Sequence, residues 1–293
     1  MARPAVGLVS GGPVDANPGV GAMLRGFQMT VQASGSRLSD AMLRAVVWGF
    51  VGGLFGMLFV VVHDAVAPQL PFLDPLLLAA ALAGAVGAVV YSSMRLTLLA
   101  AGACALTFAL VELASVALRA RVGELWVPEL LLGGAVVAGA LAGAYYGHSY
   151  PQSRIYRALP KTLAGLFAGL LVGAVWWLLR RVVGEVPLPL SIAVICPLVG
   201  WSYVWLAGVL VRAWGDRLAP TLDAALVGAA VSGLVALGFW ATAGMLQPDM
   251  AGGAAETIRA AVDQVPVALL AGWLGGMVAG FTRGMLGFGW YDL

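Results

Sequence analysis

The stretch Leu131–Tyr150, LLGGAVVAGALAGAYYGHSY, sets the class of fold to expect for this chain. Small residues recur there at every fourth position, at Ala135, Gly139, Gly143 and Gly147. Positions four apart lie on one face of a helix, so this face has almost no side chains and another backbone can lie directly against it. Such faces are typical of membrane helices, which associate through close van der Waals contact. The stretch therefore predicts a membrane-spanning helix that packs closely against another helix.

The composition of the whole chain also indicates a membrane protein. Of the 293 residues, 61% are hydrophobic and only 10% are charged, whereas a typical soluble domain is about 25% charged. The mean hydropathy is +0.94, and apolar runs of about twenty residues are long enough to cross a bilayer. Because the 40 glycines fall within apolar runs, they indicate helix contacts rather than loops. We expect a single transmembrane domain over residues 39–293.

The N-terminal residues 1–38 differ from the rest of the chain, because they contain scattered Gly, Pro and Ser and no long apolar run. No signal peptide is expected, since no apolar core precedes a small-residue cleavage site. Residues 1–20 are expected to be flexible. Residues 21–33 are expected to form either a short amphipathic helix on the membrane surface or a poorly ordered tail.

Eight apolar segments are predicted to span the membrane, and together they define an all-α, polytopic transmembrane helix bundle. Their expected bounds are about 41–66, 75–94, 96–118, 128–150, 160–179, 188–212, 221–245 and 265–286. Odd-numbered segments begin roughly 50–65 residues apart, a period that suggests four diverged helical hairpins. The alternative is that glycine- and alanine-rich membrane helices simply look alike. We expect four hairpins with glycine-zipper packing.

Stripes of small residues occur in several of these segments. The residues expected to form helix-packing faces are Gly139, Gly143 and Gly147, then Gly165, Gly169 and Gly173, and finally Gly272, Gly276, Gly280 and Gly284. Glycine in a helix costs about 1 kcal/mol relative to alanine, so a whole stripe of glycines implies a compensating contact. Lipid gains nothing from such a groove, and the contact is therefore expected to be another helix.

The distribution of basic residues predicts the orientation of the chain. Eleven of the 16 Lys and Arg residues lie on the side of the predicted bundle that holds the N-terminus. By the positive-inside rule this side is cytoplasmic. The chain is therefore expected in a bacterial inner (plasma) membrane with both termini in the cytoplasm. The net charge of +2 implies no nucleic-acid partner, so the expected partners are the lipid bilayer and other membrane subunits or further copies of the chain.

Two residues within the predicted spans are candidates for a transport function. Glu112 lies deep in the apolar run FALVELASVAL, where an ionisable side chain is expensive and is by default a hypothesis for cation binding or proton relay. The alternative is a neutral carboxyl, or one paired with Arg119, that fixes helix packing. Pro197 lies in the middle of the sixth segment and is expected to kink it by removing a backbone hydrogen bond. Broken helices are what transporters use to form a site at the membrane midplane.

Other polar residues are expected to have ordinary structural roles. Asp223 begins the seventh segment, where an acidic residue favours the helix dipole. His63 and Asp64 are adjacent and are not expected to share a helical face. His148 is expected at the membrane interface. The two histidines are far apart in the chain, so a histidine-based metal site is not expected.

No motif of an enzyme is present. The sequence has no GxSxG, HExxH, P-loop or CxxC pattern. Cys104 and Cys196 are expected to be small buried residues rather than a disulfide. We therefore expect no catalytic site, no metal and no cofactor.

The sequence favours a permease- or channel-like membrane subunit that works within a larger assembly or as a homo-oligomer. The alternative is a structural or accessory subunit of a larger membrane complex. Three features favour it: the scarcity of polar groups in the spans, the absence of an energy-coupling domain, and the glycine faces. A third class, a membrane-embedded enzyme acting on lipid, would need a nucleophile or a carboxylate cluster, and neither is evident.

Overall fold

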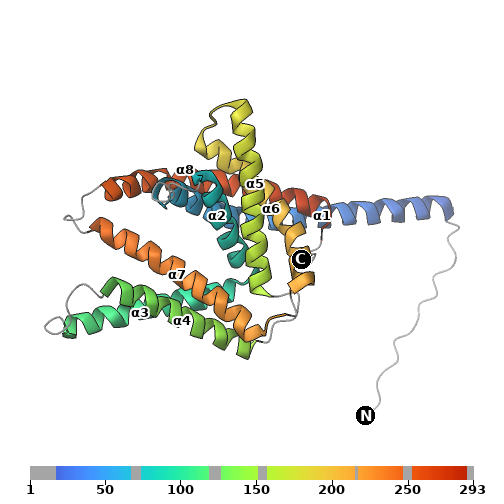
Figure 1. The fold of residues 1–293 in the computed structure, drawn as a ribbon. Coiled ribbons are helices and arrows are strands. Elements are labelled where there is room, and N and C mark those ends of the chain that lie inside the picture. Colours follow the sequence, from blue (N-terminus) through green and yellow to red (C-terminus); the bar gives the residue numbers. More distant parts are fainter. Residues whose placement is uncertain are drawn as a thin grey trace, which may run out of the picture.

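The computed structural model describes residues 18–66, 74–118, 127–150, 157–214, 217–246 and 253–288, and the regular elements within this part are all helical. Figure 1 shows their arrangement. The elements are α1 (Pro18–Val61), the π-helical turn η1 (Val62–Val66), α2 (Pro75–Ser92), α3 (Met94–Leu118), α4 (Val127–Ser149), α5 (Ala158–Val183), α6 (Leu188–Trp214), α7 (Pro220–Leu246) and α8 (Gly253–Met285).

Seven of the described helices are long and apolar enough to cross a membrane. This confirms the all-α class and is consistent with an integral membrane protein. The described part of α4 is outside this set. The eighth span therefore stays a prediction.

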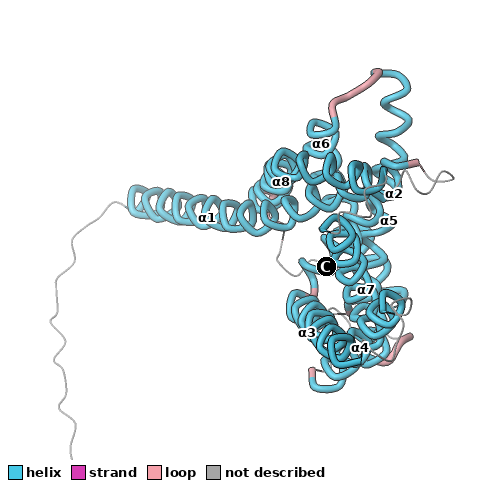
Figure 2. The backbone as a smooth tube through the Cα atoms, turned by 90° about the vertical axis from the view of Figure 1, so that its left-hand side faces the viewer, coloured by secondary structure: helices cyan, strands magenta, loops and turns pink. Residues whose placement is uncertain are grey.

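The expected bounds agree with α2 to α7 to within four residues at both ends. Helices α1 and α8 begin earlier than expected, at Pro18 and Gly253, and Pro266 lies inside α8. Residues 21–33, expected as a separate surface helix or a tail, are part of one unbroken α1. The start of α1 projects away from the other helices (Figures 1 and 2). Residues 1–17 and the side chains of 18–36 lie outside the described part.

The closest helix pairs join segments that are far apart in the chain. Helix α1 packs chiefly against α8, α2 against α5, and α4 against α7. The contacts of Gly52 with Gly272 and of Gly56 with Ala268 show that α1 and α8 run antiparallel. Of the four expected hairpins, α3–α4 and α5–α6 are side by side, whereas α7 and α8 make only a small contact. The described contacts therefore do not show the four-hairpin arrangement.

Two groups of helices make up the described structure. The five-helix group consists of α1, α2, α5, α6 and α8 and contains the largest hydrophobic core. The three-helix group consists of α3, α4 and α7; it has one small core of its own and shares a second with the ends of α2 and α5. Figures 1 and 2 both show α3, α4 and α7 together, apart from α1 and α8.

Within the three main pairs, backbone lies where a side chain would otherwise be. A Cβ added to Gly276 would lie 2.8 Å from the carbonyl carbon of Trp48, and one added to Gly169 would lie 2.6 Å from that of Ala80. Ten glycines of α4, α5 and α8 were expected from the sequence to form helix-packing faces. At nine of these ten, a Cβ would come within 3.0 Å of an atom of another helix. At the tenth, Gly173, the nearest atom would be 3.1 Å away. These close approaches fix how α1, α2 and α8 surround the site described next.

Candidate functional site

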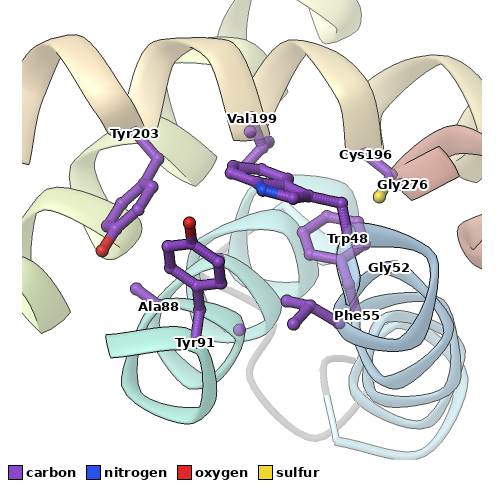
Figure 3. Close-up of a pocket in the computed structure, with 13 residues that line it drawn as sticks. Trp48, Gly52, Phe55, Ala88, Tyr91, Cys196, Val199, Tyr203 and Gly276 are labelled. Atoms are coloured by element: carbon purple, nitrogen blue, oxygen red, sulfur yellow. The ribbon is translucent and has the colours of Figure 1, made fainter. Parts of the chain in front are cut away.

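A cavity of about 40 Å³ lies inside the five-helix group, between α1, α2, α6 and α8 (Figure 3). A water molecule needs about 10–15 Å³ of such space, so the cavity has room for about three. Four aromatic side chains and five glycine backbones form most of its wall. They are Trp48, Phe55, Tyr91 and Tyr203, with Gly52, Gly84, Gly87, Gly200 and Gly276.

Glycines place the aromatic rings around this cavity. A Cβ at Gly200 of α6 would lie 2.6 Å from the six-membered ring of Trp48, so the ring of Trp48 occupies the space that a side chain would take. Gly52 and Gly276 bring the α1 and α8 backbones together beside it. The lack of side chains at Gly52, Gly200 and Gly276 thus allows the close contact between α1 and α8 and leaves the space beside it.

The aromatic rings form a connected cluster. The ring centroids of Trp48 and Tyr91 are 5.1 Å apart, and those of Tyr91 and Tyr203 are 6.3 Å apart in an edge-to-face arrangement. Figure 3 shows the Tyr91 hydroxyl directed toward the space between the Trp48 and Tyr203 rings. The guanidinium of Arg283, which is only 2% exposed, lies 5.0 Å from the Trp48 ring centroid. This cation–π contact places a positive charge beside the cluster.

One polar group at the cavity is unsatisfied. Tyr203 is buried, and its hydroxyl makes no hydrogen bond in the described part of the structure. Ser92 is close enough to influence this hydroxyl, but the Ser92 hydroxyl donates to the Ala88 carbonyl at 2.7 Å. A buried polar group without a partner costs about 1–3 kcal/mol.

A second, larger hollow of about 420 Å³ lies where α1 ends, α2 begins and α5 ends. Its wall combines apolar groups such as Leu76 and Trp177 with ionisable side chains, which are His63, Asp74, Arg180, Arg181 and Glu185. The Asp74 carboxylate accepts a hydrogen bond from the Leu76 amide at 2.9 Å and so caps α2. The guanidinium of Arg181 stacks over Trp177 at 4.2 Å. This hollow is an open, charged mouth, in contrast to the apolar cavity.

His63 and Asp64 contact each other at this mouth. The distance from His63 Nδ1 to Asp64 Oδ1 is 2.6 Å. Adjacent residues were not expected to share a helical face, yet these two side chains reach each other. The pair lies in the π-helical turn η1 at the end of α1, where the two side chains bend toward each other.

The two hollows lie along the same pair of helices, α1 and α2. Phe55 lines the cavity and His63 lines the mouth, about 12 Å apart at the helical rise of ~1.5 Å per residue. Phe59 lies between them, fully buried, with its ring 5.8 Å from Phe55 and 6.2 Å from the stacked ring of His63. Leu76 of α2 is also buried there. Apolar side chains therefore separate the mouth from the cavity.

The structure places one of the two transport candidates beside the cavity. Pro197 follows Cys196, which lines the cavity, and α6 continues through it as one helix. A Cβ at Gly275 of α8 would lie 2.9 Å from Pro197 Cδ, so this glycine accommodates the proline ring. Glu112 lies on α3, and its side chain is outside the described part. Helix α3 lines neither hollow.

Sequence reasoning missed the role of Asp223. This residue lies in the first turn of its own helix, α7, as expected, and its carboxylate also caps α5. Oδ2 accepts from the Ala158 amide at 2.9 Å and Oδ1 from the Leu159 amide at 3.2 Å. Asp223 is 1% exposed. A partner 65 residues away leaves no local sequence signal.

The described residues offer few side chains for metal binding or thiol chemistry. Among them, no group of three or more His, Cys, Asp or Glu side chains could hold a metal ion. Cys104 and Cys196 are buried free thiols. Comparison of the chain with protein-family models, curated proteins and solved structures finds no match.

Proposed function

We propose that this protein is a permease- or channel-like membrane subunit that passes a small, uncharged molecule through the five-helix group. The observation that carries the proposal is the alignment of a polar mouth, an apolar barrier and an aromatic cavity along α1 and α2. A mouth that admits a solute and an inner site that binds it are the two parts that a transport path needs. The subunit would work within a larger assembly or as a homo-oligomer.

The wall of the cavity favours an uncharged solute. It consists of ring faces, glycine backbones and small apolar side chains, and moving an ion from water into such surroundings is expensive. The Tyr91 hydroxyl is directed toward the space between the Trp48 and Tyr203 rings (Figure 3) and is positioned to hydrogen-bond a polar but neutral molecule. Small solutes with one or two hydrogen-bonding groups fit this description.

Phe59 is the residue proposed to control passage. It is fully buried between the rings of Phe55 and His63. Rotation of its side chain, together with a small separation of α1 from α2, would join the mouth to the cavity. The barrier is closed in the described structure.

The glycine faces are proposed to act as zippers that hold the three antiparallel pairs together in the membrane. The close backbone contacts of α1 with α8, α2 with α5 and α4 with α7 support this. Faces that are occupied within the chain are not free to bind other subunits. The glycine faces therefore do not favour an accessory subunit, and a transport function is the better supported of the two proposals.

A structural or accessory subunit remains the second candidate, favoured by the surface of α3. Only 17% of the apolar stretch of α3 is buried within the chain, the smallest share among the seven candidate spans. Leu106, Leu110 and Leu113 are exposed on it. Stoichiometric partners that co-purify in mild detergent would favour this candidate, and a homo-oligomer alone would favour transport.

Flux measurements in liposomes test the proposed function. A Cβ at Gly87, which lines the cavity, would have one neighbour, Val51 Cγ1 at 3.6 Å, an ordinary contact. Gly87→Ala should therefore fold normally and narrow the cavity. With small neutral solutes such as urea or glycerol, osmotic swelling should be faster with the parent protein than in empty liposomes, and Gly87→Ala should slow it.

The matched control is Gly102→Ala on α3, where a Cβ would meet nothing within 4 Å. It should leave the rate unchanged. Equal rates for Gly87→Ala and the parent, at equal protein incorporation, would exclude the cavity as the path.

A further inference from the structure

Two more polar groups of the aromatic cavity, both hydrogen-bond donors, make no hydrogen bond in the described part of the structure, although neither is covered. They are the indole N–H of Trp48 and the hydroxyl of Tyr91. Trp48 is only 7% exposed and Tyr91 is half-buried. Both residues line the cavity. The two donors are therefore accessible to a molecule inside it.

The packing of α6 sets the direction of the Trp48 donor. A Cβ at Gly200 would lie 2.6 Å from Cζ3 and 3.3 Å from Cε3 of Trp48. These carbons form the edge of the indole opposite Nε1, so the nitrogen is turned away from the α6 backbone. Figure 3 shows this nitrogen on the edge of the indole that is nearer to Tyr91, and the Tyr91 hydroxyl directed toward the space between the Trp48 and Tyr203 rings. Because the ring centroids of Trp48 and Tyr91 are only 5.1 Å apart, the two donors face the same small space.

Two donors that face one space need an acceptor between them. The indole N–H can only donate, and the phenol O–H can donate as well. A carbonyl oxygen has two lone pairs and can accept from both. None of the described residues that line the cavity is charged, and an anion would lose its hydration there at a high cost. The acceptor that fits is therefore the carbonyl oxygen of a neutral molecule.

The rest of the wall favours N–H groups on the same molecule. Aromatic ring faces carry the negative side of the ring quadrupole, and N–H groups bind weakly to them. The rings of Phe55, Trp48 and Tyr203 are all part of this wall. Hydroxyl groups fit less well, because each hydroxyl both donates and accepts. The cavity of about 40 Å³ has room for about three waters, which corresponds to a solute of about three or four non-hydrogen atoms.

We propose that the cavity binds small neutral amides, such as urea and acetamide, with the carbonyl oxygen between Trp48 Nε1 and the Tyr91 hydroxyl. The inference rests on the proposed transport function and narrows its solutes from small neutral molecules to one chemical class. Tyr91 is then a residue that determines specificity, since its hydroxyl distinguishes an amide oxygen from an apolar group.

Osmotic swelling of liposomes that contain the full chain tests the proposal. Urea and acetamide are compared with ethylene glycol, which is neutral and of similar size but carries only hydroxyl groups. The quantity measured for each solute is the rate with protein minus the rate in empty liposomes. This protein-dependent rate should be severalfold higher for the two amides than for ethylene glycol.

Tyr91→Phe locates the binding, because it removes one donor and keeps the ring. One hydrogen bond contributes about 1 kcal/mol, so the protein-dependent rate of the amides should fall by roughly fivefold. The rate of ethylene glycol should fall by less. The matched control is Tyr145→Phe, the same chemical change at a residue that is 66% exposed on α4 and lines neither hollow. It should leave all rates as in the parent.

Equal protein-dependent rates for the amides and ethylene glycol would overturn the inference and leave the transport path intact. An equal fall for all three solutes in Tyr91→Phe would do the same. No protein-dependent rate for any of them would contradict the proposed function itself. If Tyr91→Phe does not fold, the comparison of solutes on the parent protein decides alone.

Discussion

Gly276→Ala is the smallest change that tests the contact between α1 and α8. The added methyl carbon would lie 2.8 Å from the carbonyl carbon of Trp48 and 3.0 Å from Cα of Gly52. Both atoms belong to the α1 backbone, which cannot rotate aside as a side chain could. The helices must therefore separate by several tenths of an ångström or more along a contact that runs from Ala41 to Gly56.

The expected cost follows from two opposing terms. Overpacking a well-packed interior costs about 1–3 kcal/mol and occasionally more. Alanine gains at most about 1 kcal/mol over glycine as a helix former. The net effect should be a loss of about 1–2 kcal/mol in the free energy of unfolding. Gly276→Leu should cost more, because several additional carbons meet the same backbone.

The measurement is unfolding in mixed micelles of a mild detergent and increasing dodecyl sulfate, followed by tryptophan fluorescence. Gly102→Ala is the matched control, because it makes the same chemical change where no atom lies within 4 Å. It should be neutral or stabilise the protein by up to about 1 kcal/mol. Val278→Leu, at a position 57% exposed on α8, should have little effect. If Gly276→Ala is as stable as the parent, or if Gly102→Ala loses as much, the reasoning on close backbone packing is wrong.

Three further predictions concern charged residues and topology. Asp223→Ala leaves one buried and one partly buried amide of α5 without their acceptor and should lower stability by about 2–4 kcal/mol. Asp263→Ala, at an exposed residue, should change it by less than about 0.5 kcal/mol in the same assay. Glu112→Gln should leave solute flux per molecule unchanged, because α3 lines neither hollow; loss of flux at unchanged stability would instead assign Glu112 a transport role. Reporter fusions after Arg157 should be cytoplasmic and those near Glu124 external, and a cytoplasmic signal at Glu124 would refute the orientation.

The helices could be predicted from the sequence because their signals are local. An apolar run bounded by Pro, Gly or charged residues defines a span without reference to any other part of the chain. For this reason α2 to α7 lie where they were expected to within four residues. The small-residue stripes are local as well, and they indicate that a backbone approaches at Gly143, Gly169 and Gly276.

The partners in these contacts could not be predicted. One stripe of small residues resembles another, so nothing in the sequence states that α1 packs against α8 rather than α2. Nearest neighbours in the chain were the natural expectation, and they led to hairpins. The same limit applies to Asp223, whose acceptor role depends on where α5 and α7 begin relative to each other.

The aromatic cavity also depends on the arrangement of several helices. Trp48, Tyr91 and Tyr203 lie on α1, α2 and α6, and each alone looks like one more aromatic residue in an apolar span. Only the packing around Gly52, Gly200 and Gly276 brings their rings together. A sequence pattern could identify the glycines but not the space that they leave.

The accessibility of Cys196 tests the proposed path most directly. Cys196 lines the cavity, whereas Cys104, the other of the two cysteines, is fully buried in the core shared by α3, α4 and α7 and lines neither hollow. Cys104→Ala therefore leaves a reporter in the cavity, and Cys196→Ala leaves a matched reporter outside it. Small water-soluble methanethiosulfonates should modify Cys196 in folded protein in liposomes and should leave Cys104 unmodified. If Cys196 is as unreactive as Cys104 until the protein is denatured, no water-filled path reaches the cavity and the proposed transport function is contradicted.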